Sequence, residues 1–534
     1  MTNLRIPQLS APLRDKLAQL MVVRIGSNLP PVRTVEQDAD RVAALLEQTP
    51  VGGLIVFNGQ ADATPRTLER LQQACAYGLW VGADIERGVG QQLRGLPLYP
   101  HAMAFDALQA DAGQTVAEFA RETAATARAH GLHASFSPVA DVNVDPRNPI
   151  IATRAFGVHP TRVAELAAAY VKGCRQGGLL TAAKHFPGHG NTHEDSHHEL
   201  PQDLADLATI ERVNLPPFAA CVAAGVDMLM TAHVAYPAID ASGLPATLSR
   251  RTLVDLLRTK MGFEGAVISD SLLMQGVRQA FATEGELAVA ALNAGVDLLL
   301  DVADAPQTLR DLEHAVERGE LSVERVDEAF ERLVRMKEQA FQQPGDSTTP
   351  VARAEALASR VAATACRVVK NAHALLPLDA QRPLTCLLFR PYESHLDPPE
   401  QPLAAALRER FKDVIYVEAT PSLADAELPR LQNLALEAGQ LCIAIVVKPA
   451  AWHRFGLPQG WQQLISNVAA EREFALACLG TPEGLLPYDC SVQICAFSDV
   501  PYSQIALANL LAGVALPHSA LASDAPTPDN YHPS

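Results

Sequence analysis

Residues 179–198 read LLTAAKHFPGHGNTHEDSHH, and the interpretation of the chain starts from this stretch. The short apolar run 179–183 is typical of a buried strand, so Lys184 and His185 follow at the carboxyl end of that strand. Five of the chain's 16 histidines lie between His185 and His198, among Gly, Pro and polar residues that disfavour a helix or core strand. We expect such a loop to be exposed, and exposed polar loops carry function.

Seven other short apolar runs alternate with longer helical stretches, a pattern typical of parallel α/β architecture. The eight predicted strands cover residues 20–23, 53–57, 79–83, 134–138, 179–183, 227–230, 266–269 and 296–300. Eight such units predict a (β/α)8 TIM-type barrel. An open doubly wound sheet stays the alternative, because periodicity does not show closure. Between two strands, the apolar spacing of residues 161–174 predicts a helix that ends before Gly177.

A polar segment around residues 342–350, QQPGDSTTP, interrupts this alternation and is interpreted as a linker. The sequence therefore predicts a barrel domain at 1–342, a linker at 343–352 and a smaller α/β domain at 353–518. The remaining residues, 519–534, are rich in Pro, Ser and Asp and are predicted to be disordered. Strands of the second domain are predicted at 384–389, 414–417, 441–447 and 492–496.

Composition limits the class of partner. A formal net charge of -17 over 534 residues argues against nucleic acid and against an anionic membrane surface, which require clustered Lys and Arg. No signal-peptide core and no run of about 20 apolar residues is present, so cytoplasmic residence is expected. The nine cysteines are scattered in apolar runs and are expected to be reduced core residues. A small ligand, uncharged or cationic, is favoured.

In a barrel the active site lies at the carboxyl ends of the strands, so the polar residues just after each predicted strand are site candidates. They are Asn58, Asp84, Glu86, Asp141, Asn143, Lys184, His185, His233, Asp270 and Asp301. Asp270 is either a nucleophile or base, or the N-cap of the next helix. Asp84 either accepts hydrogen bonds from a ligand's hydroxyl groups or pairs with Lys184 or Arg154, and both can hold at once.

The histidine-rich loop permits two chemistries. Its imidazoles could bind a metal, but the ligands would be spread over a Gly-Pro loop without rigid support. Alternatively, Asp195 could orient His197 two residues away and stabilise its charged form for acid–base catalysis. The second interpretation is preferred, and no metal or other cofactor is predicted.

Residues 184–201 resemble the run Lys-His-(Phe/Ile)-Pro-Gly-His-Gly-(Asp/Asn)-Thr-x-x-Asp-Ser-His-x-x-Leu-Pro of glycoside hydrolase family 3 β-N-acetylglucosaminidases in their two-domain form. Residues 141–151, 154–157, 230–240, 245–249 and 262–274 resemble the same family, and a weaker likeness extends into the second domain. The chain departs from the family in one place: it reads ERGVGQQ over residues 86–92, where Glu-Gly-Gly-Arg-Val-x-Arg is common. A sugar-binding Arg is therefore lost or displaced.

The resemblance implies a retaining β-N-acetylhexosaminidase that releases terminal β-linked N-acetylglucosamine from muropeptides or chitooligosaccharides. It makes Asp270 the nucleophile, His197 the general acid and base, and Asp195 the partner of His197. The implied substrate-binding residues are Asp84, Arg154, Lys184, His185 and His233. The alternatives are a family 3 β-glucosidase, a β-N-acetylglucosaminide phosphorylase, a metal-dependent hydrolase and a non-catalytic sugar-binding protein. The sequence does not indicate an oligomeric state.

Overall fold

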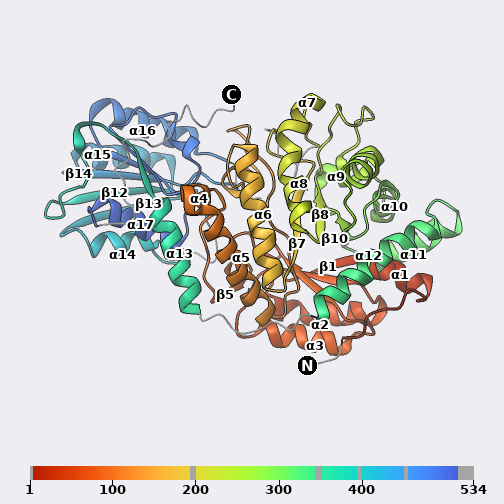
Figure 1. The fold of residues 1–534 in the computed structure, drawn as a ribbon. Coiled ribbons are helices and arrows are strands. Elements are labelled where there is room, and N and C mark those ends of the chain that lie inside the picture. Colours follow the sequence, from red (N-terminus) through yellow and green to blue (C-terminus); the bar gives the residue numbers. More distant parts are fainter. Residues whose placement is uncertain (1–3, 193–199, 343–350, 394–397, 450–454, 515–534) are drawn as a thin grey trace. The chain divides into compact units, whose positions relative to one another are not determined.

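The computed structural model describes residues 4–192, 200–342, 351–393, 398–449 and 455–514. The chain divides into two compact units (Figure 1). The first consists of residues 1–98, 113–148 and 159–354, and the second of 99–112, 149–158 and 355–534. Two segments between barrel strands thus belong to the second unit. The domain limits predicted at residues 342 and 353 stay a prediction, and the proposed tail 519–534 lies outside the described residues.

The first unit is built on an eight-stranded parallel sheet in the order β10-β1-β2-β4-β6-β7-β8-β9. A parallel bridge between Ile268 of β9 and Leu298, just before β10, joins the two ends of this order. The predicted barrel is therefore confirmed, and the open doubly wound sheet is wrong. Its strands are β1 (Met21–Ile25), β2 (Gly53–Val56), β4 (Trp80–Ala83), β6 (Ala134–Ser135), β7 (Leu180–Phe186), β8 (Met228–Thr231), β9 (Ala266–Ile268) and β10 (Leu299–Leu300).

A helix follows each barrel strand, and local sequence signals set several helix ends. Thr34 begins α2 with a capping box, in which its hydroxyl accepts from the Gln37 N–H at 3.2 Å. The helix predicted from residues 161–174 is α6, which ends at Gly177 as expected. The helices after the strands are α2 (Val35–Gln48), α3 (Thr64–Ala74), α5 (Ala112–Ala129), α6 (Pro160–Gln176), α8 (Leu215–Ala224), a π-helical segment (Arg251–Lys260), α10 (Glu284–Ala294) and α11 (Ala305–Glu317).

The remaining elements complete this part of the chain. The strands β3 and β5 pair with each other in a separate two-stranded ladder. The bounds are α1 (Leu13–Gln19), β3 (Gly59–Gln60), β5 (Leu93–Arg94), α4 (Met103–Asp106), α7 (Leu207–Thr209), α9 (Gln275–Arg278) and α12 (Val323–Gln342).

The last barrel helix, α12, places polar side chains against residues that immediately precede strands. Lys337 is fully buried, and its Nζ donates to Gln19 Oε1 at 2.6 Å and to the Gly78 carbonyl at 2.7 Å. Gln339 donates to Asp227 at 2.6 Å. Because these partners lie one or two residues before β1, β4 and β8, α12 covers the amino-terminal end of the barrel, opposite the expected site.

A buried carboxylate belongs to the same end. Asp297, two residues before β10, has no solvent exposure and accepts from three arginines. Arg325 lies 2.6 Å away, Arg258 2.7 Å and Arg332 3.1 Å, and the Val267 N–H donates at 2.9 Å. A buried charge is tolerated only when it is paired and hydrogen-bonded in this way. This end of the barrel therefore stabilises the fold.

The second unit is a six-stranded sheet in the order β11-β16-β15-β14-β12-β13, with β11 antiparallel to β16 and the other pairs parallel. Its four predicted strands are present, and the prediction missed β11 and β15. Its elements are α13 (Val351–Ala365), β11 (Arg367–Asn371), β12 (Leu384–Phe389), α14 (Pro402–Arg408), β13 (Val414–Ala419), α15 (Leu428–Glu437), β14 (Gln440–Ile445), α16 (Gln459–Glu471), β15 (Ala475–Cys478), β16 (Val492–Cys495) and α17 (Pro501–Leu511).

The faces of this second sheet follow from strand alternation. Leu384, Cys386 and Leu388 of β12 share one core with α14 and α17. Phe389 contacts Trp461 of α16, with ring centroids 5.4 Å apart. Because successive side chains of a strand point to opposite faces, the sheet is covered by helices on both sides. All nine cysteines are unpaired and eight are buried, as the sequence predicted.

No helix among the described residues has the length and apolar character needed to cross a membrane.

Lys337 gives the barrel a testable pH dependence. Burial lowers the pKa of Lys337 to about 7, whereas an unfolded lysine titrates near 10.4. Between these values the unfolded chain binds more protons than the native chain, so the Lys337 contribution to stability rises with pH from about 7 to about 10. We expect wild type to gain stability relative to Lys337→Met between pH 6 and pH 9, measured by urea unfolding.

A matched control is Lys260→Met, which removes a lysine whose side chain is 60% exposed. Its difference from wild type should be the same at both pH values. If the difference in stability between wild type and Lys337→Met is also the same at pH 6 and pH 9, the lowered pKa of Lys337 is contradicted.

Candidate active site

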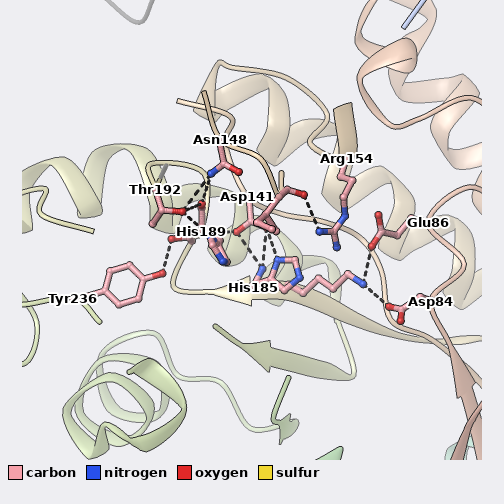
Figure 2. A network of polar contacts seen from close by, with 12 residues as sticks. Asp84, Glu86, Asp141, Asn148, Arg154, His185, His189, Thr192 and Tyr236 are labelled. Carbon is pink, nitrogen blue, oxygen red and sulfur yellow. Dashed lines mark hydrogen bonds and ion pairs between the residues drawn. The ribbon is translucent and has the colours of Figure 1, made fainter. Parts of the chain in front are cut away.

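The carboxyl end of β7 carries Lys184 and His185, as predicted, but both side chains are buried rather than exposed (Figure 2). The strand is longer than the apolar run that predicted it and continues to Phe186. The peptide bond between Lys184 and His185 is cis. The two side chains bind different acidic partners, so they form two connected parts of one site.

Asp141 is the partner of His185. Its carboxylate is fully buried and accepts from the His185 Nδ1–H at 2.7 Å, from the His185 backbone N–H at 3.2 Å and from the His189 N–H at 2.7 Å. Burial alone would raise the pKa of Asp141, but the charge and hydrogen bond of His185, with those of His189, hold it below its ordinary value. Because a carboxylate only accepts, Nδ1 of His185 must carry its proton.

The turn that follows β7 is held by further hydrogen bonds. The Tyr236 hydroxyl donates to the Gly188 carbonyl at 2.6 Å, and Asn148 Nδ2 donates to the His189 carbonyl at 2.8 Å. A Cβ at residue 190 would lie 1.7 Å from the Val142 carbonyl oxygen, so this position requires Gly190. The expectation of an exposed loop is therefore wrong for the residues up to Thr192, because the protein itself satisfies their polar groups.

His189 lies inside this turn. Burial and the charge of His185 lower the pKa of His189 to about 4, so its ring is neutral at neutral pH. Its Nδ1 lies 2.9 Å from the Thr192 hydroxyl. A neutral, enclosed ring of this kind supports the turn and is a poor candidate for proton transfer at neutral pH.

The described chain resumes at residue 200 beside the same turn. Asp203 is buried and accepts from Asn191 Nδ2 at 2.8 Å and from Asn214 Nδ2 at 3.1 Å. Residues 191 and 203 are thus held together. Asp195 and His197, predicted as the acid–base pair, lie outside the described residues.

Lys184 forms the second part of the site. Its Nζ lies 2.6 Å from Asp84 Oδ1 and 2.8 Å from Glu86 Oε1, while the lysine is only 2% exposed. Figure 2 labels Asp84 and Glu86, and it shows their side chains on the same side of His185. The predicted pairing of Asp84 with Lys184 is confirmed. Asp84 follows β4, so the carboxyl ends of β4 and β7, which β6 separates in the sheet, both contribute to this ion pair.

Asp270 follows β9 and is partly buried. The next helix, α9, has Met274 as its N-cap, so the helix-capping interpretation of Asp270 is wrong. Instead, Asp270 Oδ1 accepts from the backbone N–H of Ser271 at 2.7 Å. Burial alone would raise the pKa of Asp270, but the charges of His185 and His233, the Ser271 N–H and the charge of Lys184 lower it. The carboxylate is therefore ionised at neutral pH.

His233 follows β8 and is buried. Its Nδ1 lies 2.7 Å from the Thr247 hydroxyl, and its Nε2 lies 3.1 Å from the Ser271 carbonyl oxygen. Because a carbonyl only accepts, Nε2 carries a proton and donates. The ring is thus fixed beside the residue that follows Asp270.

Arg154 is placed differently. It ends a short helix (Ala152–Arg154) in the second compact unit, where its Nη1 donates to the Ile150 carbonyl at 3.0 Å. Its predicted contact with a sugar stays a prediction. In the segment that departs from the family pattern, Gln92 donates to the Asp84 carbonyl at 3.0 Å, and Arg94 donates to Asn58 at 2.8 Å.

Sequence reasoning missed the central role of Asp141 and the contributions of Tyr236 and Asn148. Asp141 was predicted only as one polar residue among many after a strand. Its pairing depends on how β6 and β7 lie beside each other, and no local motif encodes that.

Within the described ranges, no group of three or more His, Cys, Asp or Glu side chains could hold a metal. His193, His197 and His198 lie outside those ranges, so absence of a metal stays a prediction.

Residues 12–336 match the model of the glycosyl hydrolase family 3 N-terminal domain. The chain belongs to glycosyl hydrolase family 3. The sequence-based prediction of a glycoside hydrolase is thereby confirmed.

Several named relatives resemble this family 3 chain. It is 39% identical over 258 residues to a β-hexosaminidase of Thiobacillus denitrificans, covering 47% of this chain and 71% of that one. It is 36% identical over 227 residues to β-hexosaminidase A of Pseudoalteromonas piscicida, covering 39% of this chain but only 38% of that relative. A solved family 3 β-N-acetylglucosaminidase from a Paenibacillus species matches with a TM-score of 0.83 at 28% identity, covering 95% of this chain and 97% of that one.

Asp141 supplies a test of how the site is held. Asp141→Asn places an amide against the N–H groups of His185 and His189 and should lower the free energy of unfolding by about 3 kcal/mol at pH 7. Because the pKa of Asp141 is depressed, its contribution is present above pH 4 and is lost as the pH falls further. Urea unfolding at pH 7 and pH 3.5 measures both effects.

The control is Asp40→Asn, which alters an exposed ion pair with Arg70 and should cost less than about 1 kcal/mol. Similar small losses for both variants would show that Asp141 does not anchor the turn.

Proposed function

We propose that this family 3 chain is a retaining β-N-acetylhexosaminidase that releases terminal, non-reducing β-linked N-acetylglucosamine. The β-hexosaminidase and β-N-acetylglucosaminidase names of its relatives support the sugar. The observation that carries the mechanism is Asp270: an ionised carboxylate at the end of β9, with Lys184, His185 and His233 close enough to lower its pKa. An anionic carboxylate is what attack on an anomeric carbon requires.

In the first step, an Asp270 carboxylate oxygen bonds to the anomeric carbon as the bond to the leaving oxygen breaks. His197, oriented by Asp195, donates its proton to that oxygen, and a glycosyl-enzyme forms. In the second step, a water molecule transfers a proton to His197 and attacks the same carbon, which releases Asp270. Histidine suits this exchange because its ordinary pKa near 6.5 allows it to act as acid and as base.

Substrate binding is assigned to the groups beside Asp270. Asp84 and Glu86 accept hydrogen bonds from sugar hydroxyls, while Lys184, held between them, donates to sugar oxygens. His185 and His233 have fixed rings, which favours one orientation of the ligand. Arg154 is proposed as a further sugar-binding residue from the family resemblance. Muropeptides and chitooligosaccharides are the proposed natural substrates.

The test is the rate of hydrolysis of an aryl β-N-acetylglucosaminide and of the matching β-glucoside, each with and without inorganic phosphate. Asp270→Ala should lower kcat/KM on the preferred substrate by roughly a thousand-fold, because the covalent step is lost. Asp255→Ala, an exposed site on the π-helical segment, serves as the control.

The outcomes separate the alternatives. Faster release of glucose than of N-acetylglucosamine would indicate a β-glucosidase, and a sugar phosphate formed only with phosphate would indicate a phosphorylase. Binding of the sugar without turnover would indicate a non-catalytic protein. An undiminished rate for Asp270→Ala would overturn the mechanism.

His197 is tested by changing the leaving group. His197→Ala should reduce kcat/KM strongly for chitobiose, whose leaving oxygen must be protonated, and much less for an activated nitrophenyl glycoside. Steady-state kinetics on the two substrates measures the difference. The matched control is His130→Ala, because His130 bonds the Thr126 carbonyl and precedes β6, on the amino-terminal side of that strand. Equal loss on both substrates would contradict the acid role of His197.

A further inference from the structure

A second carboxylate lies at the rim of the barrel beyond Asp270. Asp301 follows β10, is only 1% exposed and adopts a φ of 67°, in the left-handed region. Arg24 of β1 donates to it through Nε at 3.0 Å and through its second guanidinium nitrogen. The arginine also lies over the Phe57 ring, 4.6 Å from its centroid. The ion pair balances the buried charge, so Asp301 adds little net field to the site.

The other partner of Asp301 is Ser271. The Ser271 hydroxyl donates to Asp301 Oδ2 at 2.7 Å. Its carbonyl accepts from His233 Nε2 at 3.1 Å. Ser271 is thus held from two sides, by a residue after β10 and by a residue after β8, although it lies after β9.

Ser271 in turn holds Asp270. Its backbone N–H donates to Asp270 Oδ1 at 2.7 Å, so the orientation of the Ser271 peptide fixes the orientation of that carboxylate. An N–H bound to one oxygen also favours the ionised form. The same contact leaves Oδ2 as the oxygen that can approach an anomeric carbon. Rotation of the Ser271 peptide would turn Oδ2 away from it.

We propose that Asp301, paired with Arg24, is a positioning residue that acts through Ser271 to aim the carboxylate of Asp270 at the anomeric carbon. The inference rests on the proposed role of Asp270 as the nucleophile. Asp301 touches no reacting atom, so it contributes geometry rather than chemistry. Misplacement of a reacting group by about 1 Å can cost two orders of magnitude in rate.

Two variants test this proposal. Ser271→Ala removes the hydroxyl, and Asp301→Gly removes the carboxylate at a φ that glycine adopts without strain. Each should lower kcat/KM on the aryl β-N-acetylglucosaminide by roughly ten- to a hundred-fold, while the inhibition constant of free N-acetylglucosamine changes less than about two-fold. Because both act on one contact, the double variant should be no slower than Asp301→Gly alone. Ser271→Thr keeps the hydroxyl and should retain most of the rate.

A pH profile separates positioning from a purely structural role. The acidic limb of kcat/KM reports the nucleophile of the free enzyme, which is faced by His185 and Lys184 from β7, by His233 after β8 and by Ser271. A looser Ser271 N–H bond should move this limb to higher pH in Ser271→Ala, a variant in which no charge is added or removed. A merely structural residue would lower the melting temperature and leave the limb unchanged, which would overturn the proposal.

The controls distinguish the two hypotheses. If Asp270→Ala is inactive while Ser271→Ala and Asp301→Gly keep the wild-type rate and acidic limb, the positioning role is overturned. Asp270 then remains the nucleophile. An active Asp270→Ala would overturn the nucleophile, and the positioning role with it. If Asp301→Gly does not fold, the test rests on Ser271→Ala. A wild-type kcat/KM and a wild-type acidic limb for Ser271→Ala would overturn the proposal.

Discussion

The buried carboxylate of Asp141 is the group on which the active-site end of β7 depends. A charge without solvent is costly unless several donors satisfy it, and here two backbone N–H groups and one imidazole N–H do so. All these donors belong to residues 185–189, so one side chain fixes the end of the strand, the first turn after it and the His185 ring. Lys184 is fixed in consequence, because it directly precedes a residue held on both its backbone and its side chain. The positions of Lys184 and His185, which are proposed to bind the sugar, therefore depend on a residue that need not touch the ligand.

Buried charge serves different purposes at the two ends of the barrel. At the amino-terminal end, Asp297 accepts from three arginines and a backbone N–H, and these contacts hold α12 and the π-helical segment (Arg251–Lys260) against the strands. At the carboxyl-terminal end, Asp84 accepts from Lys184, and Asp270 accepts from the backbone N–H of its neighbour Ser271. Carboxylates supplied with fewer donors retain capacity to accept hydrogen bonds from a ligand. This contrast agrees with the separation of stability and catalysis in barrels of this kind.

The sequence was sufficient for the barrel because each strand is a short apolar run bounded by helix. It failed for β15, whose Ala475–Cys478 lacks the β-branched and aromatic residues typical of strands, and for β11, an edge strand that is only partly buried. In the site, the strand-end rule identified Lys184, Asp84 and Asp270. It could not show that Asp141 binds His185, because that contact depends on the alignment of two strands. Nor could it show that a Gly- and Pro-rich segment is buried, since burial follows from hydrogen bonds made by Tyr236 and Asn148.

The charge balance of the described site bears on the acceptor in the second step. Asp84, Glu86 and Asp270 are carboxylates, and Lys184 lies between the first two. In the proposed glycosyl-enzyme the charge of Asp270 is lost, yet the two negative charges of Asp84 and Glu86 still exceed the single positive charge of Lys184. An approaching phosphate dianion gains little from such a field, whereas a neutral water molecule is not opposed by it. The sugar's hydroxyls, which donate to carboxylates, suit the same field. Under the proposed mechanism, the carboxylates assigned to bind a neutral sugar thus also favour its transfer to water.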